Sequence, residues 1–301
     1  IRVADTAVGT MSVFAGNDTD GVSIANLQIY GNRSVVTGSK TGLDFSNSQD
    51  ITIDGVYISD FVRNGITFSN TVRSEVRNSR LTNFTGRAIA LISSSSDNRI
   101  SNNTIVNADS DSSFEGAVHI DDSSNVIVSN NTIQESFIGI WVLGNSTSTQ
   151  VVGNNVFSSN RHGIQLNNGT NYSVITGNNI SESDFPQLLI ASNFNTISNN
   201  VITDGLRRGI DVNEGDGNVI DGNTLVNNGA SGNYNSIYIR ANSDGNVIAN
   251  NRIEDDAGTG NAIRILAGAV DTVLANNYYT GIGADTISDA GTNTRYDQNN
   301  R

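Results

Sequence analysis

Two histidines and the charged residues beside them are the side chains in this sequence best suited to chemistry. Asp121 follows His119 by two positions, and Arg161 directly precedes His162. A histidine of near-neutral pKa beside a carboxylate can act as a general acid or base. An arginine can neutralise a substrate carboxylate and thereby lower the barrier for removing the proton on the adjacent carbon. We therefore predict a catalytic set of His119, Asp121, Arg161 and His162.

These residues also have structural interpretations, which the sequence leaves open. A lone surface histidine is often incidental, because perturbed titratable groups also occur in structural networks. Adjacent aspartates such as Asp121-Asp122 are typical of turns. The elements that position the side chains therefore have to be worked out before the chemistry.

A repeated pattern of short apolar strands runs through the chain. Apolar-x-apolar triplets recur every 22 to 29 residues, with central residues Asp44, Thr67, Ala90, His119, Trp141, Gln165, Leu189, Asp211, Tyr238 and Arg264. A second strand follows each triplet and ends at an Asn-rich corner, whose second Asn is expected at Asn103, Asn131, Asn155, Asn179, Asn200, Asn223, Asn251 and Asn277. Two columns of residues that recur with nearly the same spacing indicate a solenoid.

This period predicts an all-β fold, a right-handed parallel β-helix of about ten or eleven turns. The hand follows from the usual preference of parallel crossovers. Leucine-rich repeats are disfavoured because their L-x-x-L-x-L frame is missing, and a globular sandwich would not keep the period. We expect one domain over residues 1–301, with an irregular N-terminal edge at 1–20 and a closing turn or tail at 282–301.

The central residue of each triplet is expected to point outward, because side chains alternate along a strand. Aromatic rings offer a flat surface to sugar rings, and carboxylates and guanidinium groups offer bidentate hydrogen bonds. An ordinary solvated face or an oligomer interface would also explain such a column. The predicted substrate-binding set is Trp141, Gln165, Arg208, Asp211, Tyr238, Arg240 and Arg264.

Composition narrows the partners. The formal net charge of -13 argues against a nucleic-acid partner, and the absence of Cys excludes disulfides and thiolate metal sites. We predict no cofactor and no structural metal, although Asp109/Asp111 or Asp255/Asp256 could bind calcium. No apolar run approaches the ~20 residues of a membrane helix. The first residue is not Met, which suggests a processed chain or an excised domain. Open coil ends would be capped by loops, further sequence or another subunit, so a homo-oligomer is possible.

The repeat V-x-x-N-N-x-I … G-I-x-[VL], found from about Gly21 to Gly281, resembles the parallel β-helix repeat of NosD-type proteins, polysaccharide lyases and mannuronan C5-epimerases. The segment SSNRHGIQL is similar to NDRHGF of the epimerases, which implies that His162 belongs to an active site. Their Y-G-F-D-P-H-E motif corresponds to residues 116–121, where the tyrosine is absent and the order is His119 then Asp121. Polygalacturonase-like hydrolases have their Asp-Asp pair and histidine about one turn apart, against two turns here for Asp122 and His162, which excludes them.

We therefore expect an extracellular or cell-surface β-helix that acts on a uronate-containing polysaccharide as a lyase or C5-epimerase. Its catalytic set would abstract and return a proton, and its outward column would bind successive sugars. The alternative is a non-catalytic surface, fibre or tailspike-like protein that binds glycan or is purely structural.

Overall fold

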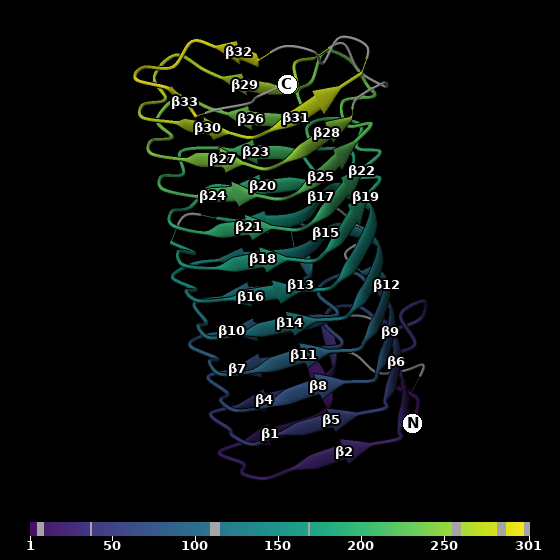
Figure 1. Ribbon diagram of the computed structural model, residues 1–301. Helices are drawn as coiled ribbons and strands as arrows, with labels where there is room; N and C mark the ends of the chain where they lie inside the picture. Colours follow the sequence, from purple (N-terminus) through teal and green to yellow (C-terminus); the bar gives the residue numbers. More distant parts are fainter. Residues whose placement is uncertain are drawn as a thin grey trace.

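A computed structural model describes residues 1–4, 9–36, 38–108, 115–167, 169–254, 260–281 and 287–297. The chain winds into a parallel β-solenoid of about ten turns, with its first strands at one end and its last strands at the other (Figure 1). Every described strand pair is parallel, as the repeat requires. The predicted fold class is confirmed. Within the described ranges, the molecule contains no helix long and apolar enough to span a membrane.

Three faces make up each coil, and we number them in chain order. The first face consists of β1 (Met11–Asn17), β4 (Lys40–Ser46), β7 (Ile66–Ser69), β10 (Ile89–Ile92), β13 (Gly116–Asp121), the ends of β15 (Thr132–Leu143) and β17 (Asn155–Leu166), β20 (Leu188–Ile190), β23 (Ile210–Val212), β26 (Ile237–Ile239), β29 (Ile263–Ile265) and β32 (Ile287–Asp289). It contains the triplets found in the sequence.

The second face is a separate sheet of short strands. It consists of β2 (Ser23–Ala25), β5 (Thr52–Asp54), β8 (Glu75–Arg77), β11 (Arg99–Ser101), β14 (Ile127–Ser129), β16 (Gln150–Val152), β18 (Val174–Thr176), β21 (Thr196–Ser198), β24 (Val219–Asp221), β27 (Val247–Ala249), β30 (Val273–Ala275) and β33 (Arg295–Asp297).

The third face follows the Asn-rich corner. It consists of β3 (Gln28–Tyr30), β6 (Tyr57–Phe61), β9 (Arg80–Phe84), β12 (Thr104–Ala108), the beginnings of β15 and β17, β19 (Asn179–Ser181), β22 (Val201–Thr203), β25 (Thr224–Val226), β28 (Arg252–Glu254) and β31 (Tyr278–Thr280). Because β15 and β17 bend from the third face onto the first, these two faces share one sheet of hydrogen bonds.

Stacked aliphatic side chains fill the interior of the coil. On the first face, Ile140, Ile164 and Leu188 lie in register on successive coils and are completely buried. Near the N-terminal end, the rings of Phe61 and Phe84 stack with their centroids 6.4 Å apart. Since each coil covers the apolar atoms of the next, the repeat buries side chains that no single coil could bury.

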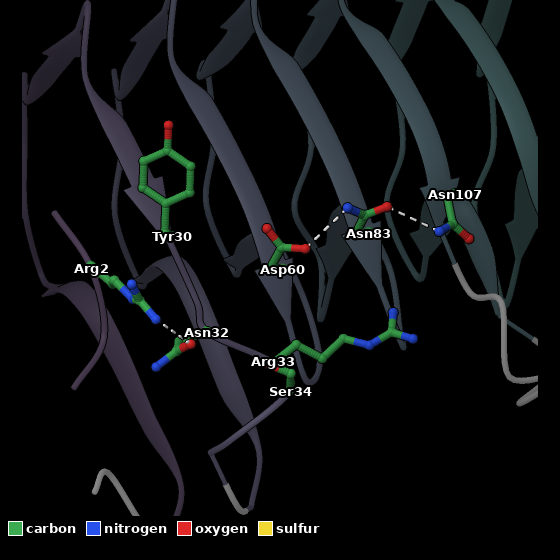
Figure 2. Close-up of a pocket in the computed structure, with 8 residues that line it drawn as sticks. All are labelled: Arg2, Tyr30, Asn32, Arg33, Ser34, Asp60, Asn83 and Asn107. Atoms are coloured by element: carbon green, nitrogen blue, oxygen red, sulfur yellow. Dashed lines mark hydrogen bonds between the residues drawn. The ribbon is translucent and has the colours of Figure 1, made fainter. Parts of the chain in front are cut away.

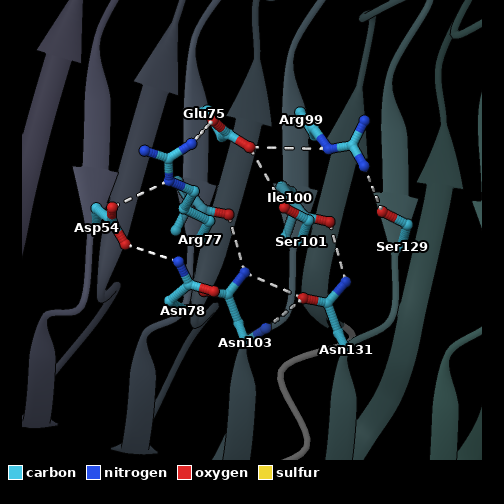
Figure 3. Close-up of polar contacts among 11 residues, drawn as sticks. Asp54, Glu75, Arg77, Asn78, Arg99, Ile100, Ser101, Asn103, Ser129 and Asn131 are labelled. Carbon is cyan, nitrogen blue, oxygen red and sulfur yellow. Dashed lines mark hydrogen bonds and ion pairs between the residues drawn. The ribbon is translucent and has the colours of Figure 1, made fainter.

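A ladder of buried asparagines joins the coils between the second and third faces. Its amides hydrogen-bond from coil to coil, for example from Asn103 Nδ2 to Asn131 Oδ1 at 3.0 Å, as Figure 3 shows. The ladder consists of Asn103, Asn131, Asn154, Asn178, Asn200, Asn223, Asn251 and Asn277. Each amide also accepts a backbone N–H of the preceding member, so the corner is satisfied internally.

Two predicted members of this ladder were wrong, because Asn155 and Asn179 begin the next strands instead. The ladder residue always follows a residue of left-handed backbone. That position is Asn102 in an Asn-Asn corner, with φ of 57°, but Gly177 in a Gly-Asn-Asn corner, with φ of 65°. In Gly-Asn-Asn corners, therefore, the ladder residue is the first Asn, here Asn178.

Regular strand pairing reaches both ends of the described residues. β1 pairs with β4 near the N terminus, while β32 pairs with β29 and β33 with β30 near the C terminus. That residues 1–301 form one domain stays a prediction.

Replacing Asn178 by Ala tests the ladder, and Asn179→Ala is its matched control. Asn178→Ala leaves the backbone N–H of Asn154 without its acceptor, inside a corner that excludes water, and removes one of the acceptors of Asn154 Nδ2. It also leaves the Val151 carbonyl without the Nδ2 donor of Asn178. We expect the free energy of unfolding to fall by about 3 kcal/mol. Asn179 is exposed, so its replacement should change stability by less than about 0.5 kcal/mol. Equal effects in denaturant titrations would contradict the ladder assignment.

Candidate functional site

His119 lies in β13 on the first face, and its side chain is almost completely buried. Only 2% of the residue is exposed, and its ring packs edge-on against Trp141 of the next coil, with centroids 5.3 Å apart. Burial lowers the pKa of His119 to about 3, and the positive charge of nearby Arg87 contributes. Arg87 forms an ion pair with Glu115 at 2.9 Å. His119 is therefore neutral at pH 7, and its pKa is lower than the near-neutral value assumed from the sequence.

His162 lies in β17 where the chain turns from the third face onto the first, and it is 3% exposed. Its Nδ1 lies 2.8 Å from the carbonyl oxygen of Pro186. Because a carbonyl can only accept, Nδ1 carries the proton and Nε2 of the neutral ring carries the lone pair. Burial lowers the pKa of His162 to about 4, although the bond to Pro186 opposes this change. The ring is thus held in one tautomer with a basic nitrogen.

Asp121 and Asp122 have different surroundings at the end of β13. Asp122 is exposed, has a φ of 47°, and accepts hydrogen bonds from the backbone N and Nδ2 of Asn145 at 2.9 and 3.0 Å. This is the turn role that the sequence also allowed. Asp121 is half-buried, and desolvation followed by the charge of Asp122 raises its pKa. Its carboxyl group therefore holds a proton more readily than an ordinary aspartate does.

Three predicted binding residues form an ion-paired cluster: Asp211 on β23, Arg208 in the corner before β23, and Arg240 directly after β26. Asp211 is fully buried and accepts from Arg240 Nε at Oδ1 and from Arg240 Nη2 at Oδ2, both at 2.8 Å. Arg208 Nη1 lies 3.2 Å from the same Oδ2. The carboxylate raises the pKa of Arg240. A buried carboxylate held by a bidentate partner fixes both arginines firmly.

Aromatic rings and arginines connect this cluster to His162. The guanidinium carbon of Arg208 lies 4.1 Å from the ring centroid of Tyr238, and that of Arg207 lies 3.9 Å from the ring centroid of Phe185. The Phe185 ring meets the His162 ring at 5.9 Å and 71°. Asp211 and Arg240 are close enough to influence the pKa of His162. We call His162, Phe185, Arg207, Tyr234, Tyr238 and the three ion-paired residues the basic cluster.

A row of polar atoms lies on the first face beside the basic cluster. His119, Trp141 and Gln165 are in register on successive coils. In the part of the chain that the structure describes, His119 Nδ1, Trp141 Nε1 and Gln165 Oε1 are buried and have no hydrogen-bond partner. Buried polar atoms without partners are costly, so this row favours a ligand or ordered water.

The remaining predicted residues lie at the margins of these groups. Arg161 is half-buried, its guanidinium carbon lies 5.9 Å from the Phe137 ring centroid, and burial lowers its pKa. Arg264 is half-buried and in register with Tyr238 on the preceding coil. The predicted residues therefore fall into two neighbourhoods, one around His119 and one around His162.

A metal site has little support among the residues that are described. Across these ranges, no three His, Cys, Asp or Glu side chains come close enough together to hold a metal ion. The aspartates named as calcium candidates, Asp109, Asp111, Asp255 and Asp256, lie outside the described residues.

Comparison with known proteins identifies the family. The model described as "Right handed beta helix region" matches residues 4–156 and 139–300. The chain belongs to the right-handed β-helix family. The two matches span nearly all of this β-helix and agree with the predicted hand. Comparison with curated protein sequences gave no match.

Solved structures share the fold of this β-helix at low sequence identity. The A-module of the mannuronan C-5 epimerase AlgE6 of Azotobacter vinelandii is 15% identical, with a TM-score of 0.59 over 99% of this chain and 80% of that one. PfbA, a surface adhesin of Streptococcus pneumoniae, is 12% identical, with a TM-score of 0.67 over 91% and 83%. The Dettilon tailspike protein is 14% identical, with a TM-score of 0.61 over 93% and 58%. These likenesses establish the fold alone.

Three residues of the basic cluster were absent from the predicted binding set. Phe185, Arg207 and Tyr234 lie in corner segments before the first-face strands, outside the periodic columns. The guanidinium carbon of Arg207 lies 5.6 Å from the Tyr234 ring centroid, and that of Arg208 lies 5.3 Å from it. Tyr234 comes from the insertion VNNGASGNYN, whose extra length was the available signal.

The two buried histidines predict how stability depends on pH. Their folded pKa values of about 3 and 4 lie below the ordinary value of 6.5, so the unfolded chain binds protons first as the pH falls. The stability that comes from keeping the two rings neutral is fully present above pH 6.5 and is lost toward pH 4. Between pH 7.5 and pH 5, each histidine should lower the free energy of unfolding by about 2 kcal/mol.

The measurement compares denaturant unfolding of the wild type with that of the double variant His119→Gln/His162→Gln across this pH range. As the pH falls, the wild type should lose more unfolding free energy than the variant does. A difference that stays constant from pH 7.5 to 5 would show that the histidines titrate normally in the folded state.

Proposed function

We propose that this β-helix is an extracellular or cell-surface enzyme that removes the proton on C5 of a uronate unit in a polysaccharide, as a lyase or an epimerase does. The single observation that carries the proposal is the basic cluster, which combines a neutral, oriented histidine with arginines and aromatic rings on one face. The epimerases and the adhesin among the solved structures with this fold support the class of substrate and the location.

His162 is the proposed base. Its Nδ1–H bond to Pro186 leaves Nε2 to accept the C5 proton, and its low pKa keeps Nε2 unprotonated at neutral pH. Removal of this proton places negative charge on the uronate carboxylate, as an enolate. Arginine side chains next to the base stabilise that charge in the transition state. The base and the stabilising charges therefore occupy one neighbourhood, as this reaction requires.

Local charge supports an anionic substrate. The chain has a formal net charge of -13, yet Arg208 and Arg240 both pair with Asp211, and Arg207 lies over the nearby Phe185 ring. Glu214 lies near enough to Arg240 to raise its pKa, which partly offsets the excess. A basic surface on an acidic protein concentrates a polyanion at this place and repels it elsewhere.

The other predicted residues complete the binding surface and the proton transfers. Trp141 and Gln165 offer an aromatic ring and unpartnered polar atoms to a sugar, and Tyr238 and Arg264 extend the surface along the axis. The half-buried Asp121, whose pKa is raised by desolvation, returns a proton to the sugar, and the neutral His119 offers its unpartnered Nδ1 as a polar contact. In an epimerase reaction the sugar receives this proton on the opposite face of C5. In a lyase reaction the C4 oxygen leaves instead, and a C4–C5 double bond forms.

A second candidate function is a non-catalytic surface or tailspike-like protein that binds glycan. The observation in its favour is the almost complete burial of both histidines, which also suits purely structural roles. The same basic cluster would then bind a uronate chain without turnover.

Incubation with a panel of uronate polymers tests the proposal. We expect either ultraviolet absorbance from an unsaturated product or, by NMR, inversion at C5. His162→Gln should lower kcat at least about 100-fold, because it removes the base, and should leave glycan affinity within a few-fold. Asn179→Ala, on the exposed third face, should retain full activity. A blank across lyase, epimerase and hydrolase assays would reject catalysis, and retained binding would then favour the second candidate.

The pH profile gives an independent check. Because His162 must be neutral to accept the proton, kcat/KM of the wild type should stay level from neutral pH down to about pH 5. It should fall only as the pH approaches the folded pKa of about 4. An acid limb centred near 6.5 would mean that the base is an exposed group or that the His162 ring is solvated in the working enzyme.

A further inference from the structure

A polar hollow near the N-terminal end of the coil lies apart from the basic cluster. Its volume is about 680 Å³, within the range of ligand pockets. It occupies the corner between the third and first faces, along β3, β6, β9 and β12 (Figure 2). The residues that line it are Arg2, Tyr30, Asn32, Arg33, Ser34, Asp60, Asn83 and Asn107.

One wall of the hollow is a rigid row of corner side chains. Asn83 Nδ2 donates to Asp60 Oδ1, and Asn107 Nδ2 donates to Asn83 Oδ1, each at 3.0 Å (Figure 2). All three residues have left-handed backbone, with φ of 62°, 63° and 55° for Asp60, Asn83 and Asn107. Because one residue per coil repeats this conformation, the row is already positioned before any ligand binds.

Arg33 supplies the feature that points to a ligand. Its backbone N–H donates to the carbonyl of Asp60 at 2.8 Å, which anchors the residue at the corner. Its side chain extends past Asp60 toward Asn83 in Figure 2. Its Nη1 is buried and has no hydrogen-bond partner within the described residues. A guanidinium N–H removed from water without an acceptor is costly, and a carboxylate is the acceptor that matches its fork.

Tyr30 and Arg2 stand at the other end of the hollow in Figure 2. The Tyr30 ring is 36% exposed and is held edge-on against Tyr57, with centroids 5.6 Å apart. Its hydroxyl donates to Gln28 Oε1 at 3.1 Å, so the ring orientation is set from both sides. An oriented, exposed aromatic ring beside polar groups is a platform for a sugar ring.

The charge of the hollow favours an anion. Two arginines line it against the one carboxylate of Asp60. That carboxylate is occupied, because Oδ1 accepts from Asn83 and Oδ2 accepts from Ser59 Oγ at 2.8 Å. The hollow therefore offers an aromatic surface, amides and guanidinium groups, which are the partners of an acidic sugar.

We propose that this hollow is a second carbohydrate site, which binds a carboxylate-bearing sugar unit through Arg33 and Tyr30. The site is separate from the basic cluster and needs no catalysis there. It would hold an acidic glycan at the N-terminal end of the coil whether or not the chain is turned over elsewhere.

Calorimetry with short glucuronate, galacturonate and mannuronate oligomers tests the proposal, with neutral oligomers of the parent hexoses as comparison. Trp141, the single tryptophan, lies on the first face, so its fluorescence reports binding near the basic cluster only. We expect a binding event that leaves Trp141 fluorescence unchanged and is at least about tenfold weaker in Arg33→Gln. Arg33→Lys should be intermediate, because it keeps the charge but loses the fork.

Arg99→Gln is the matched control, because it makes the same change of charge on the second face. It should bind like the wild type, and melting curves should show that all variants are folded. Equal binding by wild type and Arg33→Gln would overturn the proposal, as would equal affinity for neutral oligomers or no binding of any uronate. If His162→Gln loses activity but still binds uronate oligomers through Arg33, the second site is supported independently of the proposed function.

Discussion

Hydrogen bonding between successive coils is the constraint on which the rest of this structure depends. Backbone ladders join each strand to its counterpart one coil away, and the buried asparagines repeat that bonding with side chains. A single coil cannot bury its apolar face alone, so each coil depends on its neighbours for its core. The position of a side chain is consequently defined by its coil and its column.

The stacking also determines the chemistry of the outward side chains. Residues more than twenty positions apart in sequence become neighbours at one strand spacing, as His119 and Trp141 do. Such neighbours cover one another, so an outward column is not a row of solvated groups. This is why both histidines are desolvated and have low pKa values, and why Asp211 needs two arginines to be buried.

Regular columns were predictable, and the corners between them were less so. The period located His119, Trp141, Gln165 and Asp211 on one face, because a strand allows only two side-chain directions. The corner motif varies between Asn-Asn and Gly-Asn-Asn, so taking the second Asn each time misplaced the ladder at Asn155 and Asn179. The corners before the first-face strands vary in length, so Phe185 and Tyr234 could not be assigned to the basic cluster from the repeat.

The sequence by itself determined the parallel β-helix, the residues that share its first face and the asparagine corner, since all of these follow from a period that strand geometry makes unambiguous. The tertiary structure alone decided which charges pair, which tautomer His162 adopts and where the surface is hollow. Those properties depend on distances of a few ångströms between side chains from different coils and on exclusion of water between them. Neither is contained in the spacing of residues along a chain.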